Sequence, residues 1–197
     1  MDIRFAEKIS DHISEYMYQN QIVDADELQV CKYNLQVFFE RTVTFLSLGV
    51  LSLLIGHLLD IAVFTITLMA LRVFSGGFHC KTFLGCFILT IVSGLLSVPL
   101  SSLVAGSEIL LGLFSLVTMV LIGSVNHPDM NWSCSEFSVA KRWSRAIAII
   151  VFVITIALTM TEVTNTYSAY TAVGSALAAA SLLIAKTIEL WNRFLAP

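Results

Sequence analysis

Six apolar stretches follow one another through most of this chain, and they restrict what it can fold into. They cover about residues 42–59, 61–74, 83–105, 109–125, 146–160 and 167–185. Several approach the ~20 residues that a helix needs to cross ~30 Å of hydrocarbon. With 57% hydrophobic residues, 13% charged residues and a mean hydropathy of +0.84, the chain is too apolar for a soluble globule. We therefore expect an all-α membrane protein with about six transmembrane or partly re-entrant helices.

The second stretch is short for a membrane span. At 1.5 Å per residue, residues 61–74 reach only ~21 Å. Two explanations remain open at this point. Either the helix begins before Asp60, or the glycine pair Gly76-Gly77 dips into the bilayer and completes the depth.

The first 41 residues are polar and have helical periodicity. Apolar side chains fall near one face of a first helix, and a second helix is expected through residues 33–39. The apolar face consists of Phe5, Ile9, Ile13, Tyr16 and Met17. This pattern favours amphipathic cytoplasmic helices on the membrane surface, although a cap packed on the bundle is equally compatible with it. We expect a single domain over 1–197: a surface segment (1–41), a transmembrane body (42–185) and a cytoplasmic tail (186–197).

The basic residues predict the orientation. All eleven Lys and Arg residues lie before the first stretch, near the junction of the second and third, between the fourth and fifth, or after the sixth. The other connections carry Asp60, Glu108 and Glu162. The positive-inside rule then places both termini in the cytoplasm. All four cysteines fall on that side, so we expect no disulfide framework. The net charge of −3 and the lack of a basic run argue against nucleic-acid binding.

Residues 72–86 concentrate chemistry at the junction of the second and third stretches. They read Arg72-Val-Phe-Ser-Gly-Gly-Phe-His79-Cys-Lys81-Thr-Phe-Leu-Gly-Cys86. Ionisable side chains at membrane depth usually have a function. A thiol with an imidazole nearby can attack a carbonyl carbon, which predicts the active site of a membrane-embedded cysteine peptidase.

A pairing of His79 with Cys86 requires a break in the helix. On one continuous helix the two backbones would be separated by ~10.5 Å of rise, too far for a hydrogen bond. The flexibility would come from Gly76, Gly77 and Gly85, and Thr82 would cap a helix that starts near Phe83. Cys86 would then lie just beyond the first turn. The positive end of this helix and Lys81 would both favour the thiolate.

Other interpretations of these residues remain open. Cys80 competes with Cys86 as the nucleophile, and either cysteine could be a small apolar packing residue. Arg72 could be a structural anchor. His79, Cys80 and Cys86 are also possible zinc ligands together with His127 and Cys134, but their spacing does not support a metal site, and we expect no metal or cofactor.

The motif Arg72-x-x-Ser-Gly-Gly77-x-His79, with Cys86 seven residues further on, closely resembles the signature of the AgrB family, the accessory gene regulator B proteins of quorum-sensing systems. The similarity extends to Lys32-Tyr33-Asn-Leu and to the loop from Asn126-His127-Pro128 through Glu136 to Lys141-Arg142. It implies a protein of the bacterial cytoplasmic membrane with its active site on the cytoplasmic side.

By this resemblance, the chain is a cysteine endopeptidase that processes a short amphipathic autoinducer propeptide. Cys86 would be the nucleophile and His79 its base. Removal of the C-terminal tail would leave an acyl-enzyme thioester, and a thiol or hydroxyl of the peptide would then close a thiolactone or lactone ring. Arg72 and Gly77 match family positions, in a supporting or substrate-binding role. Gln36, Asn126, Asp129 and Glu136 are only candidates for a third catalytic residue.

Two further functions stay open. The chain could be a small peptide exporter without protease activity, or a scaffold for a membrane complex. The last stretch also bears small residues on one face, Gly174, Ala178 and Ser181, which permit close helix contact either within one chain or in a homodimer.

Overall fold

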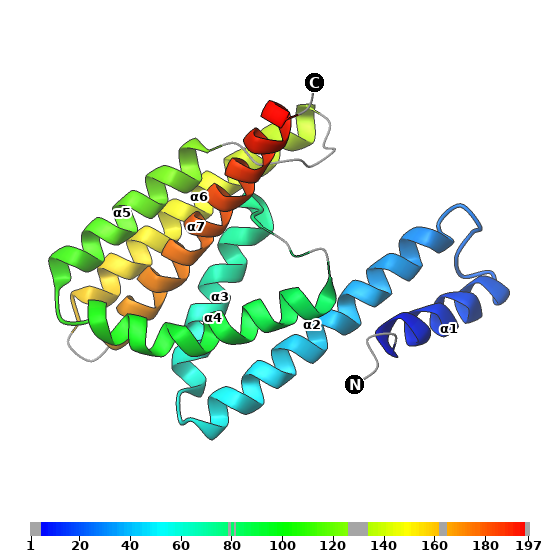
Figure 1. Cartoon of the computed structure of the whole chain (residues 1–197), viewed down its shortest axis with the longest axis horizontal. Helices are drawn as coiled ribbons and strands as arrows, with labels where there is room; N and C mark the ends of the chain where they lie inside the picture. The colour runs from blue at the N-terminus through cyan, green and yellow to red at the C-terminus, as the bar shows by residue number, and fades with distance from the viewer. Residues whose placement is uncertain (1–4, 79, 81, 126–133, 162–164, 196–197) are drawn as a thin grey trace. The chain divides into compact units, whose positions relative to one another are not determined.

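Seven α-helices and no strand make up the part of the chain that the structure, a computed structural model, describes: residues 5–78, 80, 82–125, 134–161 and 165–195 (Figure 1). The helices are α1 (Phe5–Gln19), α2 (Leu28–Leu54), α3 (Leu58–Ser75), α4 (Phe83–Val104), α5 (Glu108–Ser124), α6 (Cys134–Thr159) and α7 (Asn165–Leu195). The all-α prediction is therefore confirmed.

The six apolar stretches correspond to the helices α2 to α7, but the first, residues 42–59, runs past the end of α2 at Leu54 and into the start of α3. Five helices are long and apolar enough to cross a membrane, and the shorter α5 is apolar as well. Its 17 residues give ~25 Å at 1.5 Å per residue, the lower end of what a span needs. Helix α3 begins at Leu58, before Asp60, and its 18 residues reach ~27 Å. This earlier start accounts for the short second stretch.

Helix α2 joins two segments that the sequence suggested were separate. The predicted surface helix over 33–39 and the first apolar stretch form one helix of 27 residues. No glycine or proline occurs between Leu28 and Leu48 to interrupt it. Thr42 and Thr44 donate their hydroxyls to carbonyls four residues earlier. The predicted boundary at residue 41 therefore falls inside a continuous helix.

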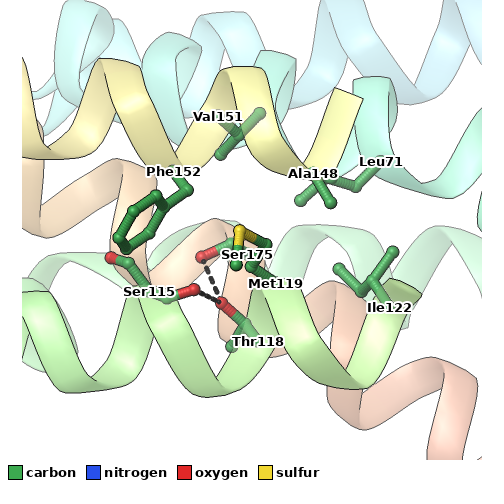
Figure 2. Close-up of a pocket in the computed structure, with 9 residues that line it drawn as sticks. All are labelled: Leu71, Ser115, Thr118, Met119, Ile122, Ala148, Val151, Phe152 and Ser175. Atoms are coloured by element: carbon green, nitrogen blue, oxygen red, sulfur yellow. Dashed lines mark hydrogen bonds between the residues drawn. The ribbon is translucent and has the colours of Figure 1, made fainter. Parts of the chain in front are cut away.

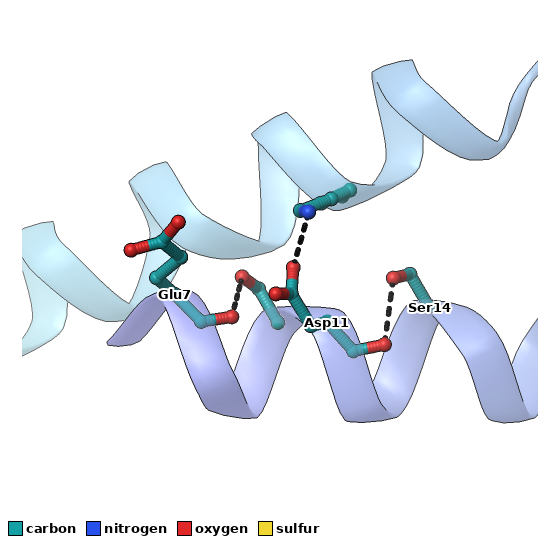
Figure 3. Close-up of polar contacts among 5 residues, drawn as sticks. Glu7, Asp11 and Ser14 are labelled. Atoms are coloured by element: carbon teal, nitrogen blue, oxygen red, sulfur yellow. Dashed lines mark hydrogen bonds and ion pairs between the residues drawn. The ribbon is translucent and has the colours of Figure 1, made fainter. Parts of the chain in front are cut away.

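The chain divides into two compact units, Met1–Leu54 with Cys80–Val92 and Ile55–His79 with Ser93–Pro197. In the first unit α1 folds back along α2 through a serine face. Ser10 and Ser14 are buried and donate to carbonyls of their own helix. The Lys32 ammonium lies 2.6 Å from the Asp11 carboxylate across the helix pair (Figure 3). Helix α1 therefore packs on α2, while its contact with a membrane surface and its packing on the bundle both stay predictions.

In the second unit α3, α5, α6 and α7 pack as a helical bundle. The core consists of Phe64, Leu68, Leu71, Ile122, Ala148, Tyr170, Val173, Ala178 and Ala179. Helix α3 lies close against α7 because Gly174 has no side chain. A Cβ atom there would come within 3.0 Å of the Phe64 carbonyl oxygen and 3.3 Å of Thr67 Cβ. The small-residue face of α7 thus serves packing within one chain.

Buried hydroxyls in this bundle are satisfied mainly by their own helices. Thr118 donates to the Ser115 carbonyl and reaches Ser175 Oγ at 3.3 Å, while Ser175 donates to the Ala172 carbonyl (Figure 2). The hydroxyls of residues 115, 118 and 175 line a small cavity of about 10 Å³. A cavity of this volume has room for about one water molecule at most, so it is too small to hold a peptide.

Substitution of Gly174 should loosen the bundle. Gly174→Val places new carbon atoms against the Phe64 carbonyl, and overpacking of this kind costs about 1–3 kcal/mol. Thermal unfolding in detergent, followed by circular dichroism, measures the loss. Gly112→Val in α5 is the matched control, because a Cβ atom there meets nothing within 4 Å. Equal melting temperatures for the two variants would contradict the packing role of Gly174.

Candidate active site

Two glycines end α3 and turn the chain away from the helix. Gly76 has a φ of +71° and Gly77 a φ of +147°, conformations that side chains with a Cβ atom rarely adopt. The Gly76 N–H donates to the Arg72 carbonyl at 2.9 Å and closes the last turn of α3. The prediction that the chain leaves the helix at the glycine pair is therefore confirmed.

The segment Gly76–Phe78 is held between α3 and α7. The Phe78 N–H donates to the Ser181 carbonyl of α7 at 3.0 Å. Arg72 Nη2 of α3 donates to the Phe78 carbonyl at 2.6 Å. Gly77 directly precedes Phe78, and a Cβ atom on it would be 2.5 Å from Ser181 Oγ and 3.4 Å from Arg72 Nε. Both the backbone conformation and the lack of space therefore require glycine at position 77.

The start of α4 places Cys86 one turn into the helix. Thr82 Oγ1 accepts a hydrogen bond from the Gly85 N–H at 3.3 Å, and the Thr82 carbonyl accepts one from the Cys86 N–H at 3.2 Å. These bonds make Thr82 the N-cap, as predicted. Cys86 is partly exposed and carries a free thiol. It lies about one turn from the start of α4.

Gly85 has a different role from the one that its sequence suggested. It was expected to add flexibility between His79 and Cys86, but it lies inside the first turn of α4. A Cβ atom there would come within 3.0 Å of Cys80 Cβ and 3.1 Å of Thr82 Oγ1. Gly85 therefore makes room for the Cys80 side chain, which packs against the capped helix end.

The structure thus brings the described site residues together in two groups. In the second unit Arg72 and Gly77 gather with Phe78 and Ser181. In the first unit Cys80 and Cys86 gather around Thr82 and Gly85 at the start of α4. His79 and Lys81 lie outside the described residues, as do the side chains of Asn126, His127, Asp129, Cys134 and Glu136. The candidate Gln36 bonds Glu40 within α2 at 3.0 Å.

Ser181 was not predicted to lie near the candidate site. The sequence pattern placed it on the small-residue face of α7, but nothing local indicates that this face reaches the glycine pair. One signal in the sequence could have indicated the contact. Ser181 is a small residue near the end of one apolar stretch, and the glycine pair Gly76-Gly77 follows the end of another. That coincidence becomes informative only once the packing of α3 on α7 is known.

The arrangement is suited to acyl transfer. A partly exposed thiol near a helix N-terminus can attack a carbonyl carbon, and backbone N–H groups at the start of a helix can stabilise the resulting oxyanion. The segment Gly76–Phe78, which precedes residue 79 in the chain, is held by hydrogen bonds to the N–H and the carbonyl of Phe78.

Comparison with known proteins agrees with the motif. No curated protein and no solved structure matches the chain. The family model of accessory gene regulator B matches residues 10–186, nearly the whole chain. The chain therefore belongs to the AgrB family, a membrane protein family with a role in autoinducer peptide processing.

Proposed function

We propose that this protein is a cysteine endopeptidase that removes the C-terminal tail of an autoinducer propeptide and promotes its cyclisation. The observation that carries the proposal is the helix break between Ser75 and Phe83. A single regular helix would hold His79 and Cys86 too far apart for a hydrogen bond, and the end of α3 at Ser75 and the start of α4 at Phe83 rule out such a continuous helix. Membership of the AgrB family supports the peptide substrate.

In the first step His79 takes the thiol proton and Cys86 Sγ attacks the carbonyl carbon of the scissile peptide bond. The carbon–nitrogen bond breaks, and His79 returns the proton to the leaving amine of the tail. A thioester now joins the peptide to Cys86. Lys81 and the start of α4 would favour the thiolate before attack and after release.

In the second step a thiol or hydroxyl of the bound peptide attacks this thioester. His79 accepts its proton, the bond to Cys86 breaks, and the proton returns to the cysteine. With a peptide thiol, one thioester replaces another at nearly equal energy, so ring closure needs no ATP. Water is the competing nucleophile, and a half-buried site at the edge of the bilayer limits hydrolysis. The pattern of basic residues supports a site on the cytoplasmic side.

Arg72 and Gly77 support the reaction by positioning the chain next to His79. Arg72 donates to the Phe78 carbonyl, and Gly77 fills a space in which a side chain would meet α7. These contacts favour a positioning role for both residues over direct binding of the peptide tail. A homodimer stays a separate proposal, since the small-residue face of α7 is used within the chain.

The dyad is tested by tail release from a candidate propeptide, with the protein in lipid and intact mass spectrometry of both partners. Wild type should release the tail and carry an acyl adduct, and Cys86→Ala should do neither. His79→Ala should be about 10²–10⁴-fold slower, the usual contribution of a general base. Cys80→Ala is the matched control and should retain activity. Cleavage by Cys86→Ala would exclude Cys86 as the nucleophile. If the protein only exports the peptide without cleaving it, no form should release the tail, wild type included, and neither substitution should change the result.

The role of Gly77 is tested by Gly77→Ala alone and combined with Ser181→Ala. The single variant should lose most tail release, because its Cβ atom meets Ser181 Oγ and its φ is unfavourable. The double variant removes the oxygen but leaves the backbone strain, so activity should return only in part. Initial rates at saturating peptide make the comparison. If Gly77→Ala released the tail as fast as wild type, the close approach of Gly77 to Ser181 would not matter for the reaction.

A further inference from the structure

Ser181 makes two contacts with the segment that precedes His79, although it lies in the last helix of the chain. Its main-chain carbonyl accepts the Phe78 N–H at 3.0 Å. Its side chain occupies the space next to Gly77, where a Cβ atom would be 2.5 Å from Ser181 Oγ. A carbonyl oxygen has two lone pairs, so this bond can form beside the ordinary hydrogen bond of the helix.

Phe78 is held on both of its polar groups by different helices. Helix α7 binds its N–H through Ser181, and α3 binds its C=O through Arg72 at 2.6 Å. A peptide unit is planar, so a fixed carbonyl also orients the bond that leads to the next residue. The next residue in the chain is His79. The two hydrogen bonds therefore hold the Phe78 residue that directly precedes the proposed base.

The size of the Ser181 side chain sets how closely the segment approaches α7. Ser181 Oγ donates to the Ala178 carbonyl at 2.9 Å, which fixes its rotamer beside Gly77. A longer or branched side chain would fill the space that Gly77 now occupies and push Phe78 away from the Ser181 carbonyl. The hydrogen bond from Phe78 would then lengthen or break.

We propose that Ser181 is a positioning residue for the reaction: α7, through Ser181, holds the segment Gly76–Phe78, which leads directly into His79. This inference rests on the proposed function, since it assigns Ser181 an effect on the His79–Cys86 pair. It makes the last helix part of the catalytic apparatus without any contact between Ser181 and the peptide.

The test enlarges residue 181 in steps and measures tail release in lipid. Along the series Ala, Ser, Thr and Val at this position, kcat should fall with size, by tenfold or more for Ser181→Val, while KM changes by less than about twofold. Ser181→Ala keeps the carbonyl acceptor and leaves the space open, so it should behave as the conservative variant. Ala180→Val is the matched control, because Ala180 is the neighbouring residue of the same helix and is exposed.

A second readout separates positioning from general packing. Iodoacetamide alkylation of Cys86 is followed against pH in a background in which Cys31, Cys80 and Cys134 are replaced by Ala. A nearby imidazolium lowers the pKa of a thiol below its usual value of about 8.5. Ser181→Val should shift the alkylation profile toward that ordinary value, and Ala180→Val should leave it unchanged. If Ser181→Val does not fold, Ser181→Thr supplies the same comparison.

Each result decides between the alternatives. Wild-type kcat and an unchanged alkylation profile in Ser181→Val would overturn the inference. A lower kcat with an unchanged profile would overturn it too, because Ser181 would then act through packing alone. Failure of the proposed function has a different signature: tail release would persist in Cys86→Ala, and wild-type Cys86 would titrate as an ordinary thiol.

Discussion

The close approach of α3 to α7 at Gly174 is the contact on which the second unit depends. In lipid, helices gain little from burying apolar surface against each other, because the hydrocarbon tails are equally apolar. Association relies on close van der Waals contact, which small residues allow. Gly174 brings the Phe64 backbone against α7, and the fully buried Ala178 continues the same face one turn later. The chain therefore leaves α3 next to Ser181 of α7.

Polar groups in the bundle add less to this association than their number suggests. The hydroxyls of three buried residues, Thr118, Thr155 and Ser175, already donate to a carbonyl of their own helix. Their contacts with other helices are additional. Hydroxyl contacts between helices among the described residues include those of Thr118 with Ser175 and of Thr155 with Thr171. Interhelical hydrogen bonds in membranes average about 0.6 kcal/mol, so shape complementarity dominates. The segment Gly76–Phe78 is the exception, because both of its interhelical bonds use backbone groups that no helix satisfies.

Features with a local cause were predictable from the sequence. The six apolar stretches, the helix break at Gly76-Gly77 and the Thr82 cap follow from residues close together in the chain. The uninterrupted α2 was also local, but the change from polar to apolar residues at 41–42 suggested a boundary that no helix breaker supports. Ser181 required tertiary information, because it receives Phe78 from a distant part of the chain. Gly85 makes room for Cys80, five residues earlier, and this role depends on how the backbone enters α4. The membrane orientation and the pairing of His79 with Cys86 stay predictions.

The bond from Phe78 to Ser181 joins residues that leave the ribosome far apart in time. Helices α4, α5 and α6 are all synthesised between its two partners. While these helices enter the membrane, the N–H of Phe78 has no access to its acceptor, and Gly77 has no contact with Ser181. The backbone that leads into His79 thus acquires its final direction only after α7 has been translated and inserted. The two interhelical contacts of Gly76–Phe78 with Ser181 therefore belong to the assembled bundle and not to the growing chain.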